Sequence, residues 1–156
     1  MKVAWDDTSR VRVGIDLCSV ADVAWSVERF GDRYLQCVFT EGELEYCNEE
    51  TALASERLAA RFAAKEATIK VLQPYGVRPE WTSIEIRRHP ESPRDSDDLR
   101  DSIESCDVVL HGAAADLARA AAIGSVSVSL SHEDDVASAV VVAVLQSGPA
   151  SSSNER

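Results

Sequence analysis

The segment RFAAKEATIK, from Arg61 to Lys70, carries four charged side chains in an alanine-rich stretch. With a rotation of about 100° per residue, its larger apolar side chains fall on one stripe and its alanines face the opposite side. Both sides therefore suit packing against other elements. We expect a helix that begins near Ser55, a good N-cap, and ends near Gln73, because Pro74 follows. The segment predicts a long central helix with charges in largely buried surroundings.

Two explanations account for the charges of this helix, which are Arg61, Lys65, Glu66 and Lys70. A buried charge costs several kcal/mol unless it is paired or binds a charged ligand. In the first explanation, Arg61 and Lys65 extend their charged ends to water, and Glu66 pairs with Lys70 one turn later. In the second, the four side chains hold an anion and a metal ion. We favour the second, because local pairing explains any one of these charges more easily than all four.

An acidic residue in a predicted strand is the candidate partner of Glu66. The segment RVRVGIDLCSV, Arg10–Val20, is apolar and β-branched and predicts a strand in which Asp16 is isolated. Asp16 caps the next helix in the simpler interpretation. Two carboxylates from different elements, with Lys65 and Lys70 nearby, also provide what Mg²⁺ bound to phosphates requires. This pattern predicts phosphoryl chemistry, although the common GxxxxGK[ST] and GxGxxG nucleotide-binding motifs are absent from the sequence.

Composition limits the class of protein. The chain has 156 residues, of which 45% are hydrophobic, enough to bury one core but not two. We expect one domain over residues 11–146, with flexible ends at 1–10 and 147–156. The 27 acidic residues exceed the 16 basic ones, and the formal charge of −11 opposes binding to nucleic acid or to an anionic membrane.

Cysteine spacing and hydropathy predict a cytoplasmic protein. The four cysteines lack the spacing of a zinc site, and no signal peptide precedes them, so we expect reduced thiols. The longest apolar run, Ala139–Leu145, is too short to span a bilayer.

Flanking segments predict the other elements. We expect a helix through Trp25 and Phe30, and another at Thr40–Cys47 that begins with a capping box of Thr40 and Glu43. Further patterns predict strands at 82–88 and 107–111, a helix at 113–123, and strands at 126–130 and 137–145. The segment 89–105, rich in Pro, Ser and Asp, predicts a surface insertion. Without regular βαβ alternation, these elements indicate an α+β fold with a mainly antiparallel sheet packed against the long helix.

The chain resembles the holo-[acyl-carrier-protein] synthase family of phosphopantetheinyl transferases in five segments: GIDL at 14–17, FTEGELEYC at 39–47, RLAARFAAKEATIK at 57–70, SIEI at 83–86 and SVSLSHEDDVASAVVVA at 127–143. The resemblance implies the 4′-phosphopantetheinyl transferase fold. It also implies Mg²⁺-dependent transfer of 4′-phosphopantetheine from coenzyme A to a serine of an apo acyl carrier protein, with release of adenosine 3′,5′-bisphosphate. A homotrimer with active sites at the subunit interfaces is implied as well.

The same resemblance assigns roles to single residues. Asp16 and Glu66 correspond to the magnesium ligands and Lys70 to the lysine that meets the pyrophosphate, and these three are the expected catalytic residues. The expected coenzyme A contacts are Arg61, Lys65, Lys70 and His132. Displacement at phosphorus needs positioning and neutralisation of charge, which Mg²⁺ and lysines provide. Glu66 is the candidate base that takes the serine proton through a water molecule.

Without the resemblance, His132 has a simpler explanation. It follows a predicted strand at the sequence SHEDD, which is typical of a turn, and a histidine there satisfies a backbone group.

Three features depart from the family pattern. Gln73–Pro74 follows the long helix, where the family usually has a small residue and glycine next to the ligand. The segment 89–105 is longer than the family's short Gly-Pro connection. Asp22 stands where the family presents a basic residue to the acidic helix of the carrier protein, and Arg29 and Arg33 are the arginines left nearby. We therefore expect a preference for a less acidic carrier protein, such as one from a specialised biosynthetic assembly.

Two other functions stay as alternatives. One is a magnesium-dependent phosphotransferase or pyrophosphate hydrolase that acts on a small molecule without a carrier protein. The other is a non-catalytic trimer that binds coenzyme A, and the intact Asp16, Glu66 and Lys70 argue against it.

Overall fold

The computed structural model describes residues 10–48, 54–74, 76, 78–89 and 106–146. Apart from Arg10 and His89, the ends expected to be flexible and the expected insertion at 89–105 lie outside these residues. The elements follow in the order β1 (Val11–Ser19), α1 (Val20–Phe30), α2 (Asp32–Val38), α3 (Glu41–Asn48), α4 (Ala54–Leu72), η2 (Trp81–Ser83), β2 (Ile84–Arg88), β3 (Cys106–Leu110), α5 (Gly112–Ala120), β4 (Ile123–Glu133) and β5 (Val136–Leu145). The α+β prediction is confirmed.

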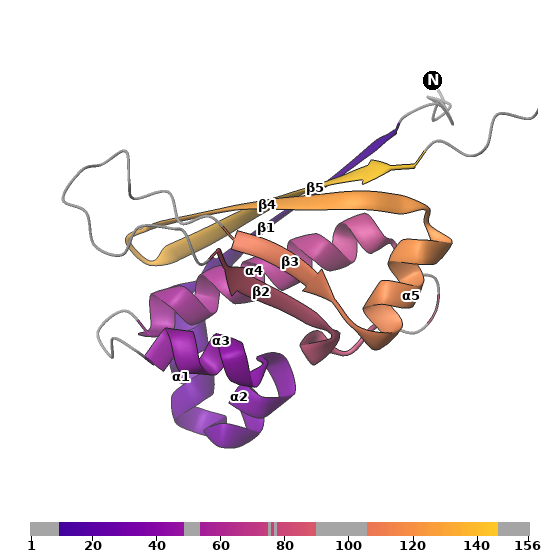
Figure 1. Cartoon of the computed structure of the whole chain (residues 1–156). Helices are drawn as coiled ribbons and strands as arrows, with labels where there is room; N and C mark the ends of the chain where they lie inside the picture. The colour runs from indigo at the N-terminus through magenta and orange to yellow at the C-terminus, as the bar shows by residue number, and fades with distance from the viewer. Residues whose placement is uncertain (1–9, 49–53, 75, 77, 90–105, 147–156) are drawn as a thin grey trace, which may run out of the picture.

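Two antiparallel sheets lie around the long helix α4. The larger sheet has the strand order β1–β5–β4, and the smaller one pairs β2 with β3. In the larger sheet, Asp16 of β1 and Leu130 of β4 lie on either side of Ala139. Figure 1 shows α4 beneath the larger sheet, with α1, α2 and α3 gathered toward one end of the molecule. Among the helices described, none is long and apolar enough to cross a membrane.

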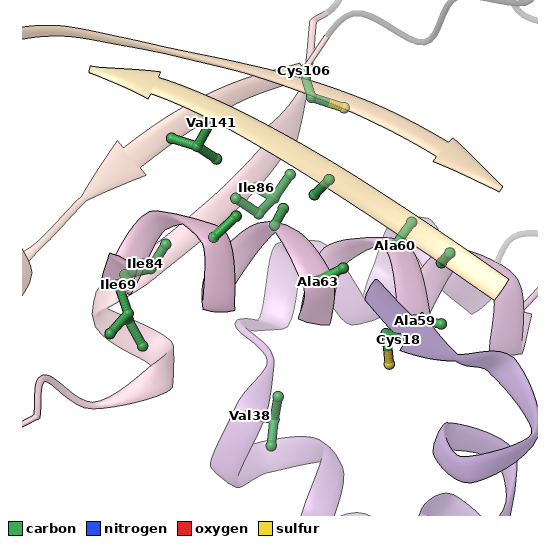
Figure 2. Close-up of a cluster of buried hydrophobic side chains, with 14 of the residues drawn as sticks. Cys18, Val38, Ala59, Ala60, Ala63, Ile69, Ile84, Ile86, Cys106 and Val141 are labelled. Atoms are coloured by element: carbon green, nitrogen blue, oxygen red, sulfur yellow. The ribbon is translucent and has the colours of Figure 1, made fainter. Parts of the chain in front are cut away.

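Small side chains let α4 approach the larger sheet closely. Ala60, Ala63 and Ala67 are buried along α4, and Gly14 of β1 crosses this row. A Cβ atom built on Gly14 would lie only 2.1 Å from the backbone oxygen of Ala67. Figure 2 shows the core that results, in which Val141 of β5 lies over the helix. The close approach at Gly14 fixes the position of β1 along α4, and therefore which side chains of the two elements come into contact.

The predicted capping box is present at the start of α3. The backbone N–H of Thr40 donates to Glu43 Oε2 at 2.8 Å, and the N–H of Glu43 donates to Thr40 Oγ1 at 3.3 Å. The Glu43 side chain is nevertheless buried, because it also pairs with Lys65 of α4 and accepts a hydrogen bond from the backbone N–H of Ile86 in β2.

Two parts of the structure differ from the prediction. The helix α2 is additional: it begins after Gly31 without a side-chain cap, so its seven residues carry little local signal. The strand β4 extends to Glu133, beyond the predicted end. The expectation that His132 lies in a turn is wrong, because it pairs with Ala137 in the β4–β5 ladder. Asp134 forms the turn instead and adopts a positive φ of 51°.

Gln73 ends α4 in the left-handed conformation, with φ 47°, and its N–H donates to the carbonyl of Ile69 at 3.1 Å. This position commonly carries glycine, because a Cβ atom is strained there. The departure at Gln73 therefore has a conformational cost.

Replacing Gln73 with glycine is expected to raise the free energy of unfolding by about 0.5 to 1 kcal/mol, after allowance for the greater freedom of glycine in the unfolded chain. Urea denaturation of both proteins measures the change. A matched Gln146→Gly variant, also at the end of an element but without a positive φ, should not gain stability. Equal or lower stability of Gln73→Gly would contradict the assigned strain.

Candidate active site

Asp16 and Lys70 meet where β1 crosses α4. Side chains two apart in a strand point to the same face, so Asp16 points to the helix side of β1 as Gly14 does. Lys70 Nζ lies 2.7 Å from Asp16 Oδ1 and donates to the carbonyl of Ile15 at 2.5 Å. The Asp16 side chain is 21% exposed and that of Lys70 is 49% exposed. The pair is therefore open to a ligand from solvent.

Glu66 lies one turn before Lys70 on α4, but the two do not pair with each other among the contacts described. The Glu66 carboxylate instead accepts a hydrogen bond of 2.5 Å from Arg78 Nη2, and the Glu66 side chain is 22% exposed. The guanidinium of Arg78 also lies 4.5 Å from the centre of the Trp81 ring. The Glu66–Lys70 pair that a purely internal network predicts is thus replaced by two pairs to other segments.

The buried thiol of Cys18 responds to the charges of both acidic side chains. Burial, together with the negative charges of Asp16, Asp22 and Glu66, raises the pKa of Cys18 to about 11. The charges of Asp16 and Glu66 therefore act on one small region between β1 and α4. A cation is favoured there, and Cys18 stays a thiol rather than a thiolate.

Asp16 and Glu66 fit a magnesium site that a substrate completes. They offer carboxylate oxygens, which Mg²⁺ prefers, and both are exposed enough to leave room for water and phosphate oxygens. Within the described residues, no three His, Cys, Asp or Glu side chains come together as a metal site. The donor set therefore suits a weakly held, substrate-assisted Mg²⁺ better than a permanent structural metal.

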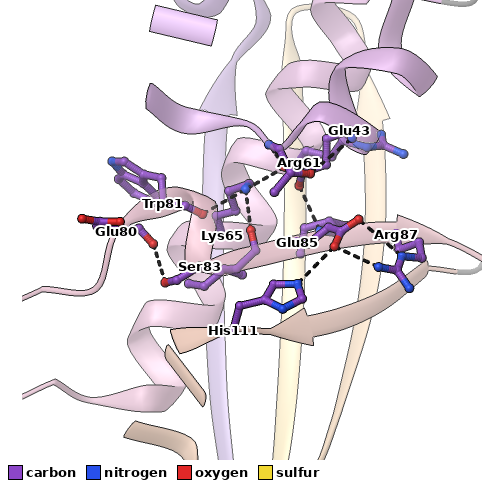
Figure 3. Close-up of polar contacts among 12 residues, drawn as sticks. Glu43, Arg61, Lys65, Glu80, Trp81, Ser83, Glu85, Arg87 and His111 are labelled. Carbon is purple, nitrogen blue, oxygen red and sulfur yellow. Dashed lines mark hydrogen bonds and ion pairs between the residues drawn. The ribbon is translucent and has the colours of Figure 1, made fainter. Parts of the chain in front are cut away.

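Lys65 is fully buried and its ammonium group already has three acceptors. Lys65 Nζ lies 2.8 Å from Glu43 Oε2 and donates to the carbonyls of Trp81 at 3.0 Å and Ile84 at 2.5 Å, as Figure 3 shows. Burial lowers the pKa of Lys65, and the Glu43 carboxylate opposes this shift. Without exposed surface, Lys65 joins α3, α4 and β2, and the expected contact of Lys65 with coenzyme A is not supported by this placement.

Arg61 borders a cavity of about 360 Å³ between α3, α4 and β2. Its guanidinium carbon lies 4.2 Å from the centre of the Tyr46 ring, and its Nη1 donates to the carbonyl of Arg57 at 3.2 Å. Arg87 and Arg88 border the same cavity. Three guanidinium groups beside one cavity suit a phosphate group.

Glu85, on the edge of this cavity, balances part of the positive charge. It accepts hydrogen bonds from Arg87 at 3.0 Å, and its Oε2 lies 3.2 Å from His111 Nε2. Burial opposes ionisation of Glu85, but the contacts with Arg87 and His111 outweigh it and hold its pKa below the ordinary value. Glu85 therefore stays charged at neutral pH.

No described contact joins His132 to Asp16 or Glu66 of its own chain. Its side chain is 58% exposed, and its Nδ1 lies 3.6 Å from Glu56 Oε2 near the start of α4. Glu66 follows Glu56 by ten residues, which is about 15 Å along a helix. His132 therefore lies nearly three helical turns from Glu66 along α4 of the same chain.

Sequence reasoning missed Arg78, Arg87 and His111. The contact of Arg87 with Glu85 could have been predicted, because the two residues are two positions apart in the predicted strand and therefore share one face. Arg78 follows an irregular connection, and His111 meets β2 only through the β2–β3 pairing. Those two positions depend on tertiary structure.

The exposed face of α1 combines aromatic and charged side chains. Trp25 is 58% exposed and Phe30 is 50% exposed, and their rings pack edge to face with centres 5.8 Å apart. The guanidinium of Arg29 lies over the Phe30 ring at 5.7 Å. Asp22 is also exposed, in the first turn of this helix.

Comparison with known proteins gives the same family from sequence and from structure. The model of the 4′-phosphopantetheinyl transferase superfamily matches residues 12–123. The holo-[acyl-carrier-protein] synthase of Koribacter versatilis is 37% identical over 131 residues, which are 83% of this chain and 94% of that protein.

Two solved structures with coenzyme A have the same fold. The holo-[acyl-carrier-protein] synthase of Helicobacter pylori in complex with coenzyme A superposes with a TM-score of 0.66 at 28% identity, over 85% of this chain and 99% of that one. The ACPS–CoA complex of Chronobacterium ammoniagenes has a TM-score of 0.69 at 26% identity, over 89% of this chain and 100% of that one. The chain belongs to the 4′-phosphopantetheinyl transferase superfamily and, within it, to the holo-[acyl-carrier-protein] synthase family.

Proposed function

We propose that this protein transfers 4′-phosphopantetheine from coenzyme A to a serine of an apo acyl carrier protein, in a reaction that requires Mg²⁺ and releases adenosine 3′,5′-bisphosphate. The observation that carries the proposal is the contact of Asp16 with Lys70 where β1 crosses α4, with Glu66 one helical turn before Lys70. Family membership supports the same reaction, and two relatives are described in complex with coenzyme A.

Each residue at the crossing has a defined task in this proposal. Asp16 and Glu66 would hold Mg²⁺, which neutralises the pyrophosphate and orients it. Lys70 contacts Asp16 when no ligand is bound. Lys70 would leave Asp16 and donate to a pyrophosphate oxygen once coenzyme A is bound. Glu66 accepts the proton of the carrier serine through a water molecule as the bond to phosphorus forms.

The cavity beside Arg61 is the proposed place for the other end of coenzyme A. The 3′-phosphate would meet the guanidinium of Arg61, and the adenine would lie near the Tyr46 ring. His132 would contact coenzyme A in the site of a neighbouring copy, because its own chain holds it near Glu56 instead.

A direct assay tests the proposed reaction. The protein is incubated with coenzyme A, Mg²⁺ and several apo carrier proteins, and the carriers are weighed by mass spectrometry. One added phosphopantetheine per carrier and an equal amount of adenosine 3′,5′-bisphosphate are expected. Cleavage of coenzyme A or another pyrophosphate without any carrier would favour the small-molecule alternative. Binding of coenzyme A without turnover on any carrier would favour the non-catalytic alternative.

One face of the larger sheet supports the proposed homotrimer. On β1, Val13 is 63% exposed, Ile15 is 57% exposed and Leu17 is 67% exposed, all on the face turned away from α4. Val140 and other valines of β5 continue this surface. None of the described elements covers it, as Figure 1 shows for the side of the sheet opposite α4. Contiguous apolar surface of this kind is typical of an interface between protein chains.

Sedimentation is expected to give a mass of about three chains, the number in a closed ring with three-fold symmetry. Leu17→Lys should dissociate the assembly and lower transfer, because it places a charge on the apolar face and separates His132 from the neighbouring site. Ala120→Lys, an exposed change on α5 away from this face, is the matched control and should stay trimeric. A monomeric wild type that transfers phosphopantetheine would exclude sites shared between subunits.

Asp22 is expected to weaken the approach of strongly acidic carrier proteins. Asp22→Arg should raise the transfer efficiency with such a carrier about three- to tenfold at low salt, since exposed charges at an interface act mainly on association. The gain should shrink at high salt, because screening acts over about 10 Å at 0.1 M ionic strength.

The measurement compares kcat/KM for two carriers of different net charge at two salt concentrations. Asp116→Arg makes the same change of charge on α5 and controls for net charge. An unchanged ratio between the carriers in Asp22→Arg, or a wild type that favours the more acidic carrier, would remove Asp22 from partner choice.

A further inference from the structure

The proposed metal site has two carboxylates, and Arg78 pairs with Glu66, the one that Lys70 does not contact. Its Nη2 lies 2.5 Å from Glu66 Oε2, while Lys70 holds Asp16. A guanidinium keeps its charge at any pH at which the protein is folded. A divalent cation that approaches Glu66 therefore competes with the charge of Arg78.

The Trp81 ring gives Arg78 a second contact that does not involve Glu66. The guanidinium carbon of Arg78 lies 4.5 Å from the centre of this ring. The ring itself packs against Phe62 of α4 with centres 5.1 Å apart, and the Trp81 carbonyl accepts from the buried Lys65. The platform is therefore fixed to α4, and Figure 3 shows Trp81 beside Lys65.

The backbone that carries Arg78 differs from the backbone that carries Lys70. Lys70 belongs to the last turn of α4, whereas Arg78 lies outside any helix or strand, after Gln73 and Gly76 with positive φ angles. The Arg78 side chain is 50% exposed. It can turn away from Glu66 without disturbing α4 or the Trp81 platform.

We propose that Arg78 is a positioning residue that holds Glu66 until metal and substrate arrive together. In the free protein it neutralises Glu66 and competes with a divalent cation, so the cation alone binds weakly. When the phosphates of the substrate enter, they offer Arg78 another anion, and Glu66 becomes free for the metal. The inference rests on the proposed metal site of Asp16 and Glu66 and adds the exchange of partners that frees Glu66 for the metal.

Binding of Mn²⁺ alone to the full-length chain, followed by electron paramagnetic resonance, tests the competition. Arg78→Met removes the charge but keeps an apolar contact with Trp81, and should tighten Mn²⁺ binding about fivefold, the equivalent of about 1 kcal/mol for an exposed ion pair. Arg78→Lys keeps a competing charge and should stay near the wild-type affinity. Arg119→Met removes the same charge from a distant exposed pair with Asp116 and controls for net charge.

Fluorescence gives a second measurement that does not depend on turnover. In a chain whose other tryptophans, Trp5 and Trp25, are replaced by phenylalanine, Mg²⁺ with coenzyme A should change the emission of Trp81 as Arg78 moves. Mg²⁺ alone should change it little. The same additions should leave the emission of the Arg78→Met variant unchanged. If the methionine variant is unstable, Arg78→Gln replaces it in both measurements.

The outcomes separate this inference from the proposed metal site. If Mn²⁺ binds the wild type and Asp16→Asn equally, the metal site itself is wrong. If binding requires Asp16 but Arg78→Met and Arg119→Met have the same affinity, the metal site stands and the role of Arg78 is wrong. Tighter Mn²⁺ binding in Arg78→Met alone, with loss of the fluorescence change, supports the inference.

Discussion

Asp16→Ala and Glu66→Ala are each expected to abolish magnesium-dependent transfer, with a loss of about 1,000-fold or more in kcat/KM, and to leave the fold intact. Either change removes a proposed oxygen ligand of Mg²⁺, so the pyrophosphate loses the charge that balances it during displacement. The fold should survive because both carboxylates are partly exposed and pair with exposed cations. Such pairs contribute about 0 to 1 kcal/mol to stability.

The control for this experiment is Asp22→Asn. It removes a third negative charge that acts on Cys18, but from a residue without a place in the proposed metal site. Transfer by Asp22→Asn should equal or exceed the wild-type rate. Transfer rates are measured at a fixed Mg²⁺ concentration, with circular dichroism to confirm folding. A rate near that of the wild type in Asp16→Ala or Glu66→Ala would mean that the metal ligands are elsewhere.

Gly14→Ala is expected to cost about 3 kcal/mol or more of unfolding free energy. The new Cβ would lie 2.1 Å from the backbone oxygen of Ala67 and 3.2 Å from Val71 Cγ1. A backbone atom cannot turn aside as a side chain does, so β1 and α4 must separate and open the core between them. Because Asp16 lies on the same face of β1, the contact between Asp16 and Lys70 is lost as well.

Gly124→Ala provides the matched comparison. There the new Cβ would meet the Gln146 side chain at 2.7 Å, and Gln146 is exposed and flexible enough to move. Denaturant unfolding of the two variants should therefore differ by several kcal/mol. Similar stabilities of Gly14→Ala and Gly124→Ala would show that the helix–strand crossing is looser than these distances require.

The central helix was predictable because its signals are local. In and around RFAAKEATIK, the helical period places the larger apolar residues on one side and the alanines on the other, and Pro74 marks the end of the helix. The capping box of Thr40 and Glu43 is equally local, since three residues separate its two members. Asp16 was identifiable because an isolated carboxylate in an apolar strand is expensive to bury.

The partners of Lys65 and Glu66 were not predictable, because they come from distant segments. Periodicity predicted largely buried surroundings for Lys65, but the pattern alone could not choose between a ligand and an internal partner for it. Its partner Glu43 is 22 positions away in the chain, in a helix whose packing against α4 is set by the tertiary fold. Arg78 lies in an irregular connection, for which no periodicity exists.

The strand β1 has two dissimilar faces, and this restricts how its length can change. Gly14, Asp16 and Cys18 face α4, while Val13, Ile15 and Leu17 form the exposed apolar face. Because side chains alternate, deleting or inserting one residue would exchange the faces beyond that point. A carboxylate would then enter the apolar surface, and a large side chain would replace glycine at the crossing. Substitutions within β1 are therefore tolerable one at a time, whereas a change of a single residue in its length alters packing, chemistry and self-association together.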